Sequence, residues 1–402
     1  MRLSDGPRQL TKSLLKRDFG LSLVLPPDRL CPPVPVRYNY IYWIQQLIES
    51  TSSESRSHVD SEQRVTGLDI GTGASSIYAL LACRTRPSWI MYASDIDSHS
   101  ISFARENVQL NDLTSRITIH HSSDKTALIP LDDLGVDRLD FVLCNPPFYS
   151  SVAEMTESNN AKSRPPSATC TGSENEMICP GGDLGFVSRI LNESLQLRGK
   201  VQWYTSMLGK LSSVHALVAK LKENNIDNYA VTSLRAGRKT RRWAVGWSFD
   251  DFRPLNAVCR GKEVSAVALP SPTEDTIRVD GVDAKAIASR LNVVMASLDI
   301  RWEWIEANFS GVGSASGNIW SRSARRKRKR AEMENHDTNK ATQSCGQVSV
   351  QALALMISIT VVDAQADVRW LRGHDGLLFE SFCGMLKRAL REGNPTRTVS
   401  QA

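Results

Sequence analysis

The chain has 402 residues, of which 41% are hydrophobic, and it carries eight cysteines and a formal net charge of +6. This length and hydrophobic content support about two domains with cores of their own. The cysteines are scattered without a Cys-x-x-Cys pair and no signal peptide is recognisable, so we expect neither a metal site nor a secreted disulfide framework. The longest apolar stretch, residues 352–362, is too short to span a bilayer, which argues against membrane insertion.

The first strand and loop form a nucleotide-binding pattern. Residues 65–70 are a short apolar run with Asp69 near its end, and Gly71, Thr72 and Gly73 follow directly. Glycines let the backbone approach a nucleotide closely, and the helical pattern that comes next places a helix N-terminus beside the same ligand. We therefore predict a strand, loop and helix that bind a nucleoside.

A second strand, residues 89–93, is followed by Asp95 and Asp97. This acidic position comes roughly 20 residues after the glycines, where a carboxylate accepts hydrogen bonds from a ribose diol. The third glycine of the dinucleotide fingerprint is missing and no second nucleotide half follows, which favours S-adenosylmethionine over a nicotinamide dinucleotide. The alternative is that Asp95 and Asp97 only cap the helix predicted at residues 101–108.

After a third strand at residues 117–121, a fourth strand at 141–144 ends in Asn145-Pro146-Pro147-Phe148. The Asn145 side-chain oxygen and the Pro146 carbonyl can each accept one N–H of a planar exocyclic amine, while Phe148 stacks on its ring. Asn-Pro is also a common turn initiator, so a turn without chemistry is the alternative.

This order of strands predicts an α/β fold, a Rossmann-like doubly wound and mostly parallel sheet that brings the strand ends to one ligand-binding edge. The segment 151–180 is rich in Ser, Thr and Asn, and we predict one long loop there. Such loops often close over a substrate, and here the loop would cover the bound planar amine.

Two groups of basic residues follow. The first contains Arg238, Lys239 and Arg241 between strand-like runs. The second has seven positive charges within residues 322–330, which suit phosphate contact or nuclear import, with a solvated linker as the alternative. The residues of this run assigned to RNA are Arg325, Arg326, Lys327, Arg328, Lys329 and Arg330.

Beyond the catalytic domain, placed at residues 1–254, we predict a smaller C-terminal α+β module in two halves. Residues 264–269 and 353–361 are expected to form strands, and apolar residues fall at helical spacing in 287–298 and 378–386. The halves are placed at 255–310 and 348–393. Gly and Ser at 310–317 and the basic run predict a disordered linker at 311–347.

The chain resembles the N6-adenine RNA methyltransferases that modify U6 small nuclear RNA in eukaryotes, whose bacterial relatives act on large-subunit ribosomal RNA. The resemblance covers nearly all of residues 8–250. The segment 368–374 and the helix after it are similar to the C-terminal RNA-binding region of animal members. The matching catalytic segments are 15–21, 35–43, 68–75, 144–148, 181–187, 203–210 and 238–244.

The resemblance implies an S-adenosylmethionine-dependent methyltransferase. Arg37 would meet the methionine carboxylate, unless it only bonds the carbonyls of a turn, Gly71 would lie against the cofactor backbone, and Asp95 would hold the ribose. Thr126 would lie by the adenine, and Lys125 is assigned to RNA. Arg238, Lys239 and Arg241, which lie beside the active-site groove in the family, would make positioning contacts with the RNA backbone. The cofactor residues are Arg37, Asp69, Gly71, Gly73, Asp95, Thr126 and Asn145, and the catalytic residues are Asn145, Pro146, Pro147 and Phe148.

We therefore predict methylation of adenine N6 in a structured RNA, with U6 small nuclear RNA as the first candidate and the nucleus, or also the cytoplasm, as the location. Ribosomal RNA is an alternative substrate, and a non-catalytic splicing or RNA-folding factor is an alternative function. The Asn-Pro-Pro-aromatic motif also serves enzymes that methylate DNA adenine or glutamine, although we expect no DNA substrate. The basic N-terminal segment usual in the family looks largely absent, which predicts weaker RNA affinity or a late start of the sequence.

Overall fold

The computed structural model describes residues 6–52, 64–160, 172–235, 241–321, 323–324, 326, 330 and 352–392. They fall into two compact units. The first unit comprises Met1–Asp250 and Ala257–Pro270, and the second comprises Asp251–Asn256 and Ser271–Ala402. The chain thus returns to the first unit after leaving it, whereas the sequence had suggested a single boundary at residue 254.

Within the described residues, the first unit is built on a seven-stranded sheet in the order β3-β2-β1-β4-β5-β7-β6. Neighbouring strands from β3 to β5 run parallel, and β7 runs antiparallel to both of its neighbours. This topology confirms the predicted doubly wound, mostly parallel sheet. The strands are β1 (Val65–Ile70), β2 (Trp89–Asp95), β3 (Ile117–His121), β4 (Leu139–Cys144), β5 (Val201–Leu208), β6 (Tyr229–Arg235) and β7 (Arg241–Trp247).

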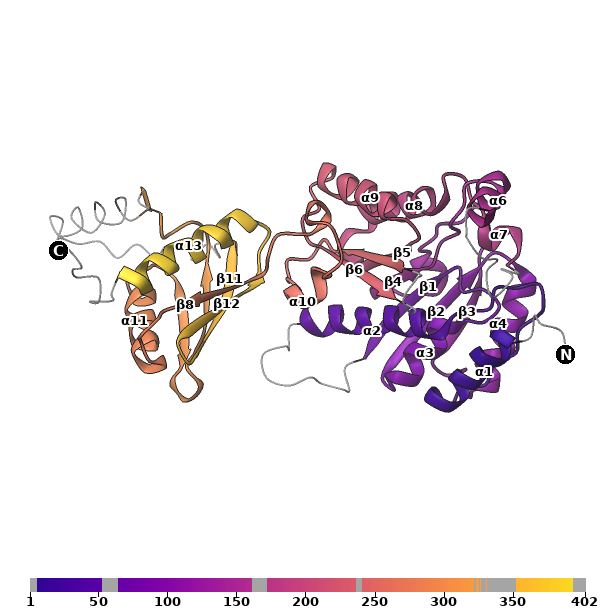
Figure 1. Cartoon of the computed structure of the whole chain (residues 1–402), viewed down its shortest axis with the longest axis horizontal. Helices are drawn as coiled ribbons and strands as arrows, with labels where there is room; N and C mark the ends of the chain where they lie inside the picture. The colour runs from indigo at the N-terminus through magenta and orange to yellow at the C-terminus, as the bar shows by residue number, and fades with distance from the viewer. Residues whose placement is uncertain are drawn as a thin grey trace. The chain divides into compact units, whose positions relative to one another are not determined.

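Helices cover both faces of this sheet (Figure 1). Helices α8 and α9 lie on one side, and α2 and α3 lie on the other. The central strands are buried almost throughout, which explains why they read as continuous apolar runs rather than alternating patterns. The helices of this unit include α1 (Gly6–Phe19), α2 (Val34–Ser50), α3 (Ile77–Thr85), α4 (Ser98–Leu110), α5 (Leu131–Leu134), α8 (Gly182–Leu197) and α9 (Leu211–Glu223).

The prediction of one long loop at residues 151–180 is wrong at both ends. Helix α6 (Val152–Asn160) begins directly after the Asn-Pro-Pro-Phe segment, and the short helix α7 (Glu174–Met177) precedes α8. A capping box between Ser173 and Glu176 starts α7, a local signal that the polar composition of the segment concealed. Residues 161–171 lie outside the described residues.

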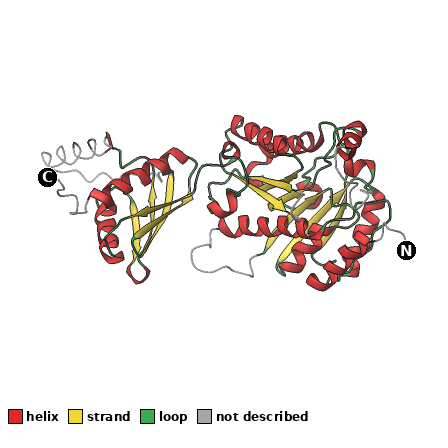
Figure 2. Cartoon of the chain, viewed as in Figure 1, coloured by secondary structure: helices red, strands yellow, loops and turns green. Residues whose placement is uncertain are grey.

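The second unit contains an antiparallel five-stranded sheet in the order β8-β12-β11-β10-β9. Its two long helices lie on one side of the sheet (Figure 2). Strands β10 and β11 pair although the basic run separates them in sequence, so both halves of the module share one sheet. The elements are β8 (Glu274–Arg278), α11 (Ala284–Ala296), β9 (Arg301–Ile305), β10 (Ser310–Ala315), β11 (Leu355–Val362), β12 (Gln365–Arg372) and α13 (Gly376–Glu392).

Two expectations for this part of the chain are wrong. Residues 264–269 form no strand but a 3₁₀ turn at Ala266–Ala268, which follows the short helix α10 (Asn256–Cys259). Val264 and Ala268 pack into the core of the first unit at a spacing of four, which a short apolar run does not reveal. The Gly-rich segment at the start of the predicted linker is strand β10.

Among the residues that the structure describes, no helix is both long enough and apolar enough to cross a membrane.

Candidate active site

A cavity opens at the carboxyl edge of the first sheet, beside the ends of β1, β2 and β4. The structure brings most of the predicted cofactor and catalytic residues together here. Asp69 lies buried at the end of β1. Asp69, Thr126 and Phe148 are not among the residues that line the cavity. The predicted residues that line it are Arg37, Gly71, Gly73, Asp95, Asn145, Pro146 and Pro147.

The glycine loop is held in a conformation that favours glycine. Gly71 and Gly73 have φ of +73° and +62°. The backbone N–H groups of Gly71 and Thr72 both donate to the Ser94 carbonyl at 2.9 Å, which fixes the loop to the end of β2. A Cβ on Gly71 would meet no atom within 4 Å, so the backbone there faces open space.

Asp69 stabilises this loop through a hydrogen bond with Thr72. Its Oδ2 accepts a hydrogen bond from the Thr72 hydroxyl at 2.7 Å, while its buried Oδ1 has no hydrogen-bond partner. Burial raises the pKa of Asp69 to about 7, against the opposing effect of the Thr72 hydrogen bond. Its Oδ1 is therefore an unsatisfied buried acceptor directly before the glycine loop.

Arg37 is a buried cation with spare hydrogen-bonding capacity. Its Nη1 donates to the hydroxyl of Tyr78 and approaches the sulfur of Met207 at 3.6 Å. Its buried Nε has no hydrogen-bond partner. Among the described residues, the Arg37 guanidinium therefore contacts side chains and not the carbonyls of a turn. The alternative role, in which Arg37 only bonds turn carbonyls, does not agree with the structure. A buried guanidinium with an unused donor suits an anionic ligand.

The two acidic residues after β2 have different roles. Asp97 is the N-cap of α4 and accepts hydrogen bonds from the backbone N–H groups of His99 and Ser100, so the capping alternative is right for this residue. Asp95 does not cap α4. Its Oδ2 accepts from the Gly73 N–H at 2.8 Å and its Oδ1 from the Asp97 N–H at 3.0 Å, which fixes its carboxylate beside the glycine loop.

Asn145 and Phe148 stand at the end of β4. Asn145 lines the cavity, and its side-chain oxygen is buried without a hydrogen-bond partner. Phe148 packs closely against Gly209, where a Cβ would lie 2.8 Å from the ring. The guanidinium of Arg242 lies 4.8 Å from the centre of the Phe148 ring. The buried Asn145 oxygen is therefore an unused acceptor that a planar amine could satisfy.

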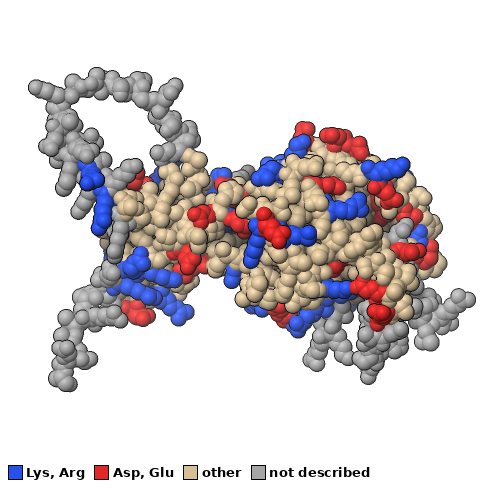
Figure 3. Space-filling view, turned by 90° about the horizontal axis from the view of Figure 1, so that it is seen from above, with Lys and Arg blue, Asp and Glu red and all other residues tan. Residues whose placement is uncertain are grey.

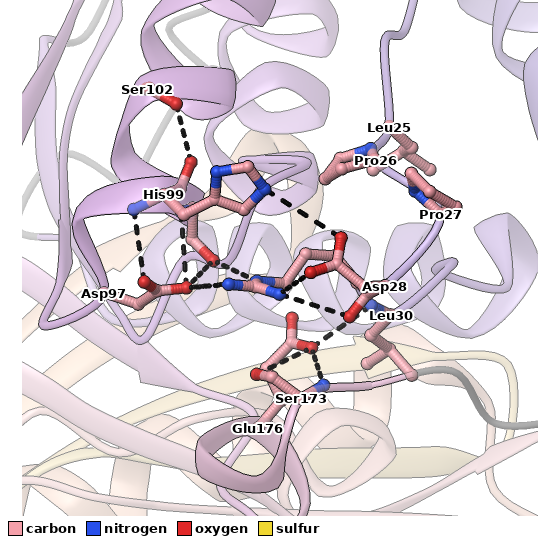
Figure 4. Close-up of polar contacts among 12 residues, drawn as sticks. Leu25, Pro26, Pro27, Asp28, Leu30, Asp97, His99, Ser102, Ser173 and Glu176 are labelled. Carbon is pink, nitrogen blue, oxygen red and sulfur yellow. Dashed lines mark hydrogen bonds and ion pairs between the residues drawn. The ribbon is translucent and has the colours of Figure 1, made fainter.

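Sequence reasoning missed three charged residues that shape this region. Asp183 holds the turn against Phe148 by accepting from the Gly209 N–H at 2.7 Å. Arg29 is buried and donates to Asp97 and Asp28, both at 2.6 Å (Figure 4). Glu176 lines the cavity. Asp183 follows two glycines and Glu176 completes a capping box, so the nearby sequence could have pointed to both residues. No local sequence pattern points to Arg29.

The predicted RNA-binding residues are dispersed. Lys125 is exposed on the loop after β3, beside Thr126, whose hydroxyl bonds the Ser123 carbonyl at 2.8 Å. Arg241 is exposed and lies 4.0 Å from Glu263. Arg326 and Arg330 are also exposed. The remaining predicted residues, which lie outside the described residues, are Arg238, Lys239, Arg325, Lys327, Arg328 and Lys329.

Charge is distributed differently over the two units. On the face seen in Figure 3, Lys and Arg are mixed with Asp and Glu over the larger first unit. Several Lys and Arg side chains gather at one place on the smaller second unit. Mixed charge near a binding site limits non-specific attraction of polyanions, whereas a gathered basic group favours it.

Comparison with known proteins supports a common origin for the whole chain. The U6 small nuclear RNA (adenine-(43)-N(6))-methyltransferase of Schizosaccharomyces pombe is 37% identical over 393 residues, which cover 96% of this chain and 94% of that protein. Vertebrate RNA N(6)-adenosine-methyltransferases METTL16 are longer, and the chain spans from 43% to 61% of their length.

Solved structures agree with this relationship. The catalytic domain of human METTL16 in complex with MAT2A 3′UTR hairpin 1 is 36% identical, with a TM-score of 0.55 over 67% of this chain and 84% of that chain. The N-terminal domain of human METTL16 in complex with SAH is 35% identical, with a TM-score of 0.50 over 62% of this chain and 83% of that chain. Residues 5–251 match the family described as RNA methyltransferase, and this confirms the resemblance seen in the sequence. The chain therefore belongs to the RNA methyltransferase family.

Proposed function

We propose that this protein transfers a methyl group from S-adenosylmethionine to the N6 amine of an adenine in a structured RNA, and that U6 small nuclear RNA is the substrate. The observation that carries the proposal is the buried, unpartnered Asn145 oxygen at the cavity wall, at the end of β4. A relative that spans nearly the same length bears the name of that activity, and another has been solved with an RNA hairpin.

The cavity fits the cofactor. S-adenosylmethionine combines a carboxylate, an ammonium group and a ribose diol, and the site offers partners of the matching kinds. The unused Nε of Arg37 suits the carboxylate, and the unused Oδ1 of Asp69 suits a hydrogen-bond donor. Asp95, fixed beside Gly73, suits the ribose. Ser122, Ser123 and Leu128 line the cavity where Thr126 does not, so we assign the adenine wall to them.

The residues at the end of β4 orient the target amine. The Asn145 side-chain oxygen and the Pro146 carbonyl accept its two N–H groups, and Phe148 stacks on the base. These contacts turn the nitrogen lone pair toward the cofactor, which supplies an electrophilic methyl group on a cationic sulfur. No side chain has to remove a proton before methyl transfer, so the rate depends on positioning and on fixed dipoles.

RNA is held by basic residues outside the cavity. Lys125 lies beside the cavity mouth, because its neighbour Asp124 lines the cavity, and Arg241 lies at the start of β7. Exposed Arg326 and Arg330 belong to the basic run of the second unit. Contacts of this kind bind phosphates and set the orientation of the RNA. A substrate that is a small nuclear RNA places the protein in the nucleus.

The test is incubation of the purified chain with radiolabelled S-adenosylmethionine and total RNA, followed by mapping of the labelled nucleotide. We expect N6-methyladenosine at one site in U6 small nuclear RNA, and none with Asn145→Ala. Label at a ribosomal adenine would change the assigned substrate. RNA binding without incorporation of label would favour the non-catalytic RNA factor instead.

A further inference from the structure

Glu176 has two carboxylate oxygens with different surroundings. Its Oε2 accepts from the backbone N–H of Ser173 at 2.8 Å, from the Ser173 hydroxyl at 3.3 Å and from the backbone N–H of Leu30 at 3.2 Å. Its Oε1 makes no hydrogen bond to the residues that the structure describes, and it lies 3.4 Å from the point where a Cβ of Gly73 would be. Oε2 is therefore bonded to the two segments that contain Ser173 and Leu30, which form one wall of the cavity, whereas Oε1 faces the glycine loop.

The wall that holds Glu176 is anchored from several sides. Leu30 belongs to a loop whose carbonyls at Pro26 and Pro27 accept from Arg8 of α1 at 2.8 Å and 2.7 Å. The same loop carries Arg29, which joins the Asp97 cap (Figure 4). Because both flanks of the loop are fixed, the hydrogen bond from Leu30 sets where the Glu176 carboxylate can lie.

Two carboxylates approach Gly73 from different elements. Asp95 accepts from its N–H at 2.8 Å, and Glu176 faces it from α7. Both residues line the cavity. Burial raises the pKa of Glu176, while hydrogen bonds from Ser173 and Leu30 and the charge of Arg29 act in the opposite direction. S-adenosylmethionine carries more than one hydrogen-bond donor, so one carboxylate does not satisfy them all.

We propose that Glu176 is a cofactor-binding residue whose Oε1 accepts a hydrogen bond from a hydroxyl or ammonium group of the cofactor, while its Oε2 holds the cavity wall. This inference rests on the proposed function. It also links the cofactor to the base pocket, because Met177 accepts from the backbone N–H of Tyr149, the residue after Phe148, at 3.1 Å. A shift of Glu176 would therefore reach the chain that carries the stacking ring.

The test is calorimetric titration of the full chain, without RNA, with two probes: S-adenosylhomocysteine and 5′-methylthioadenosine, which lacks the amino-acid part. Glu176→Gln should weaken S-adenosylhomocysteine binding by roughly 10-fold or more, because a hydrogen bond to a charged acceptor is lost. If 5′-methylthioadenosine binding falls equally, the donor is on the ribose, and if it is unchanged, the donor is the ammonium group. Either result supports the proposal.

The matched controls separate binding from wall structure. Glu174→Gln, an exposed neighbour in the same short helix, should bind both probes like the parent chain. Ser173→Ala removes the hydroxyl partner of Oε2 at 3.3 Å but keeps its two backbone N–H partners and leaves Oε1 in place, so it should weaken binding less than Glu176→Gln does. The thermal unfolding midpoint without ligand shows whether each variant is folded, and Glu176→Asp replaces Glu176→Gln if the latter is not.

The proposal is overturned if Glu176→Gln binds S-adenosylhomocysteine within about twofold of the parent chain. It is also overturned if Ser173→Ala weakens binding as much as Glu176→Gln, since Glu176 would then act only through the wall. A parent chain that binds neither probe would overturn the proposed cofactor, and this inference with it.

Discussion

Glycines serve opposite purposes in the two units. In the first unit, Gly71 and Gly73 adopt positive φ, and a Cβ on Gly71 would meet no atom within 4 Å. In the second unit, Gly311 and Gly313 lie in strand β10, and their missing side chains are replaced by other residues. A Cβ on Gly311 would lie 2.4 Å from the Trp302 ring.

The comparison shows that the structural role of a glycine depends on the residues around it in the folded protein. The first pair follows an apolar strand and precedes a helix, so its local sequence already indicates a ligand loop. The second pair stands among serines and resembles a linker, although Trp302 and Trp304 fill the space above it from the neighbouring strand. Only the first pair could be interpreted from nearby residues.

The largest expected effect is on methyl transfer in the first unit. Asn145→Ala should lower the methyl-transfer rate by roughly 100- to 1000-fold, because the amine loses a fixed acceptor. RNA affinity should stay near that of the parent chain. Single-turnover kinetics with labelled cofactor measures the rate, and filter binding measures RNA affinity. Robust turnover by this variant would refute the role of Asn145 in holding the amine.

A pH dependence should arise in the first unit from Asp69. Its pKa of about 7 exceeds the ordinary value of 3.8, so the stability it contributes is complete below about pH 4 and is lost as the pH rises through 7. Asp69→Asn should remove this loss, on the order of a few kcal/mol of unfolding free energy. Urea unfolding at several pH values measures it, with exposed Asp133→Asn as the control. Parallel curves for Asp69→Asn and the parent chain would contradict the assignment.

Filling the second glycine site should damage the second unit alone. Gly311→Val places its side chain against Trp302 and should cost roughly 1–3 kcal/mol of unfolding free energy. S-adenosylhomocysteine binding by the first unit should not change. Gly317→Ala is the control, because a Cβ there meets nothing within 4 Å. The comparison fails if Gly311→Val unfolds at the same denaturant concentration as this control.

Filling the first glycine site should damage binding as well as stability. Gly71→Ala and Gly20→Ala both place a side chain at positive φ, with nothing within 4 Å of the new Cβ. Each should lose roughly 1–2 kcal/mol of unfolding free energy. Only Gly71→Ala should also bind S-adenosylhomocysteine more weakly, because Gly71 lines the cavity and Gly20 does not. Equal binding by the two variants would show that Gly71 matters only for the turn.

The smallest effect concerns the basic run of the second unit. Replacing the six basic residues at 325–330 by Gln should lower RNA affinity by roughly 10-fold at moderate salt and flatten its salt dependence, since fewer counterions are released. The same substitutions should leave S-adenosylhomocysteine affinity unchanged. Fluorescence anisotropy across a salt series gives the slope. An unchanged slope would reassign the run to nuclear import.

Much of the first unit was predictable from the sequence because its signals are local. Strand β1, the glycine loop, Asp95 and Asn145 follow one another in an order that is typical of a doubly wound sheet. The second unit was harder to predict, because strands β9 and β10 are defined by partners rather than by their own pattern. The turn at Ala266–Ala268 shows the same limit, since a short apolar run fits either a strand or a turn.

The sequence alone indicated the fold class, the cofactor and the residues at the strand ends, because each follows from local patterns and from the order and spacing of those patterns along the chain. Only the tertiary structure decided that Arg29 reaches Asp97 and that Glu176 faces Gly73. These pairs are 68 and 103 positions apart, and no periodicity of a single helix or strand encodes a contact between separate loops. Their geometry follows from how the sheet brings distant chain segments to one edge.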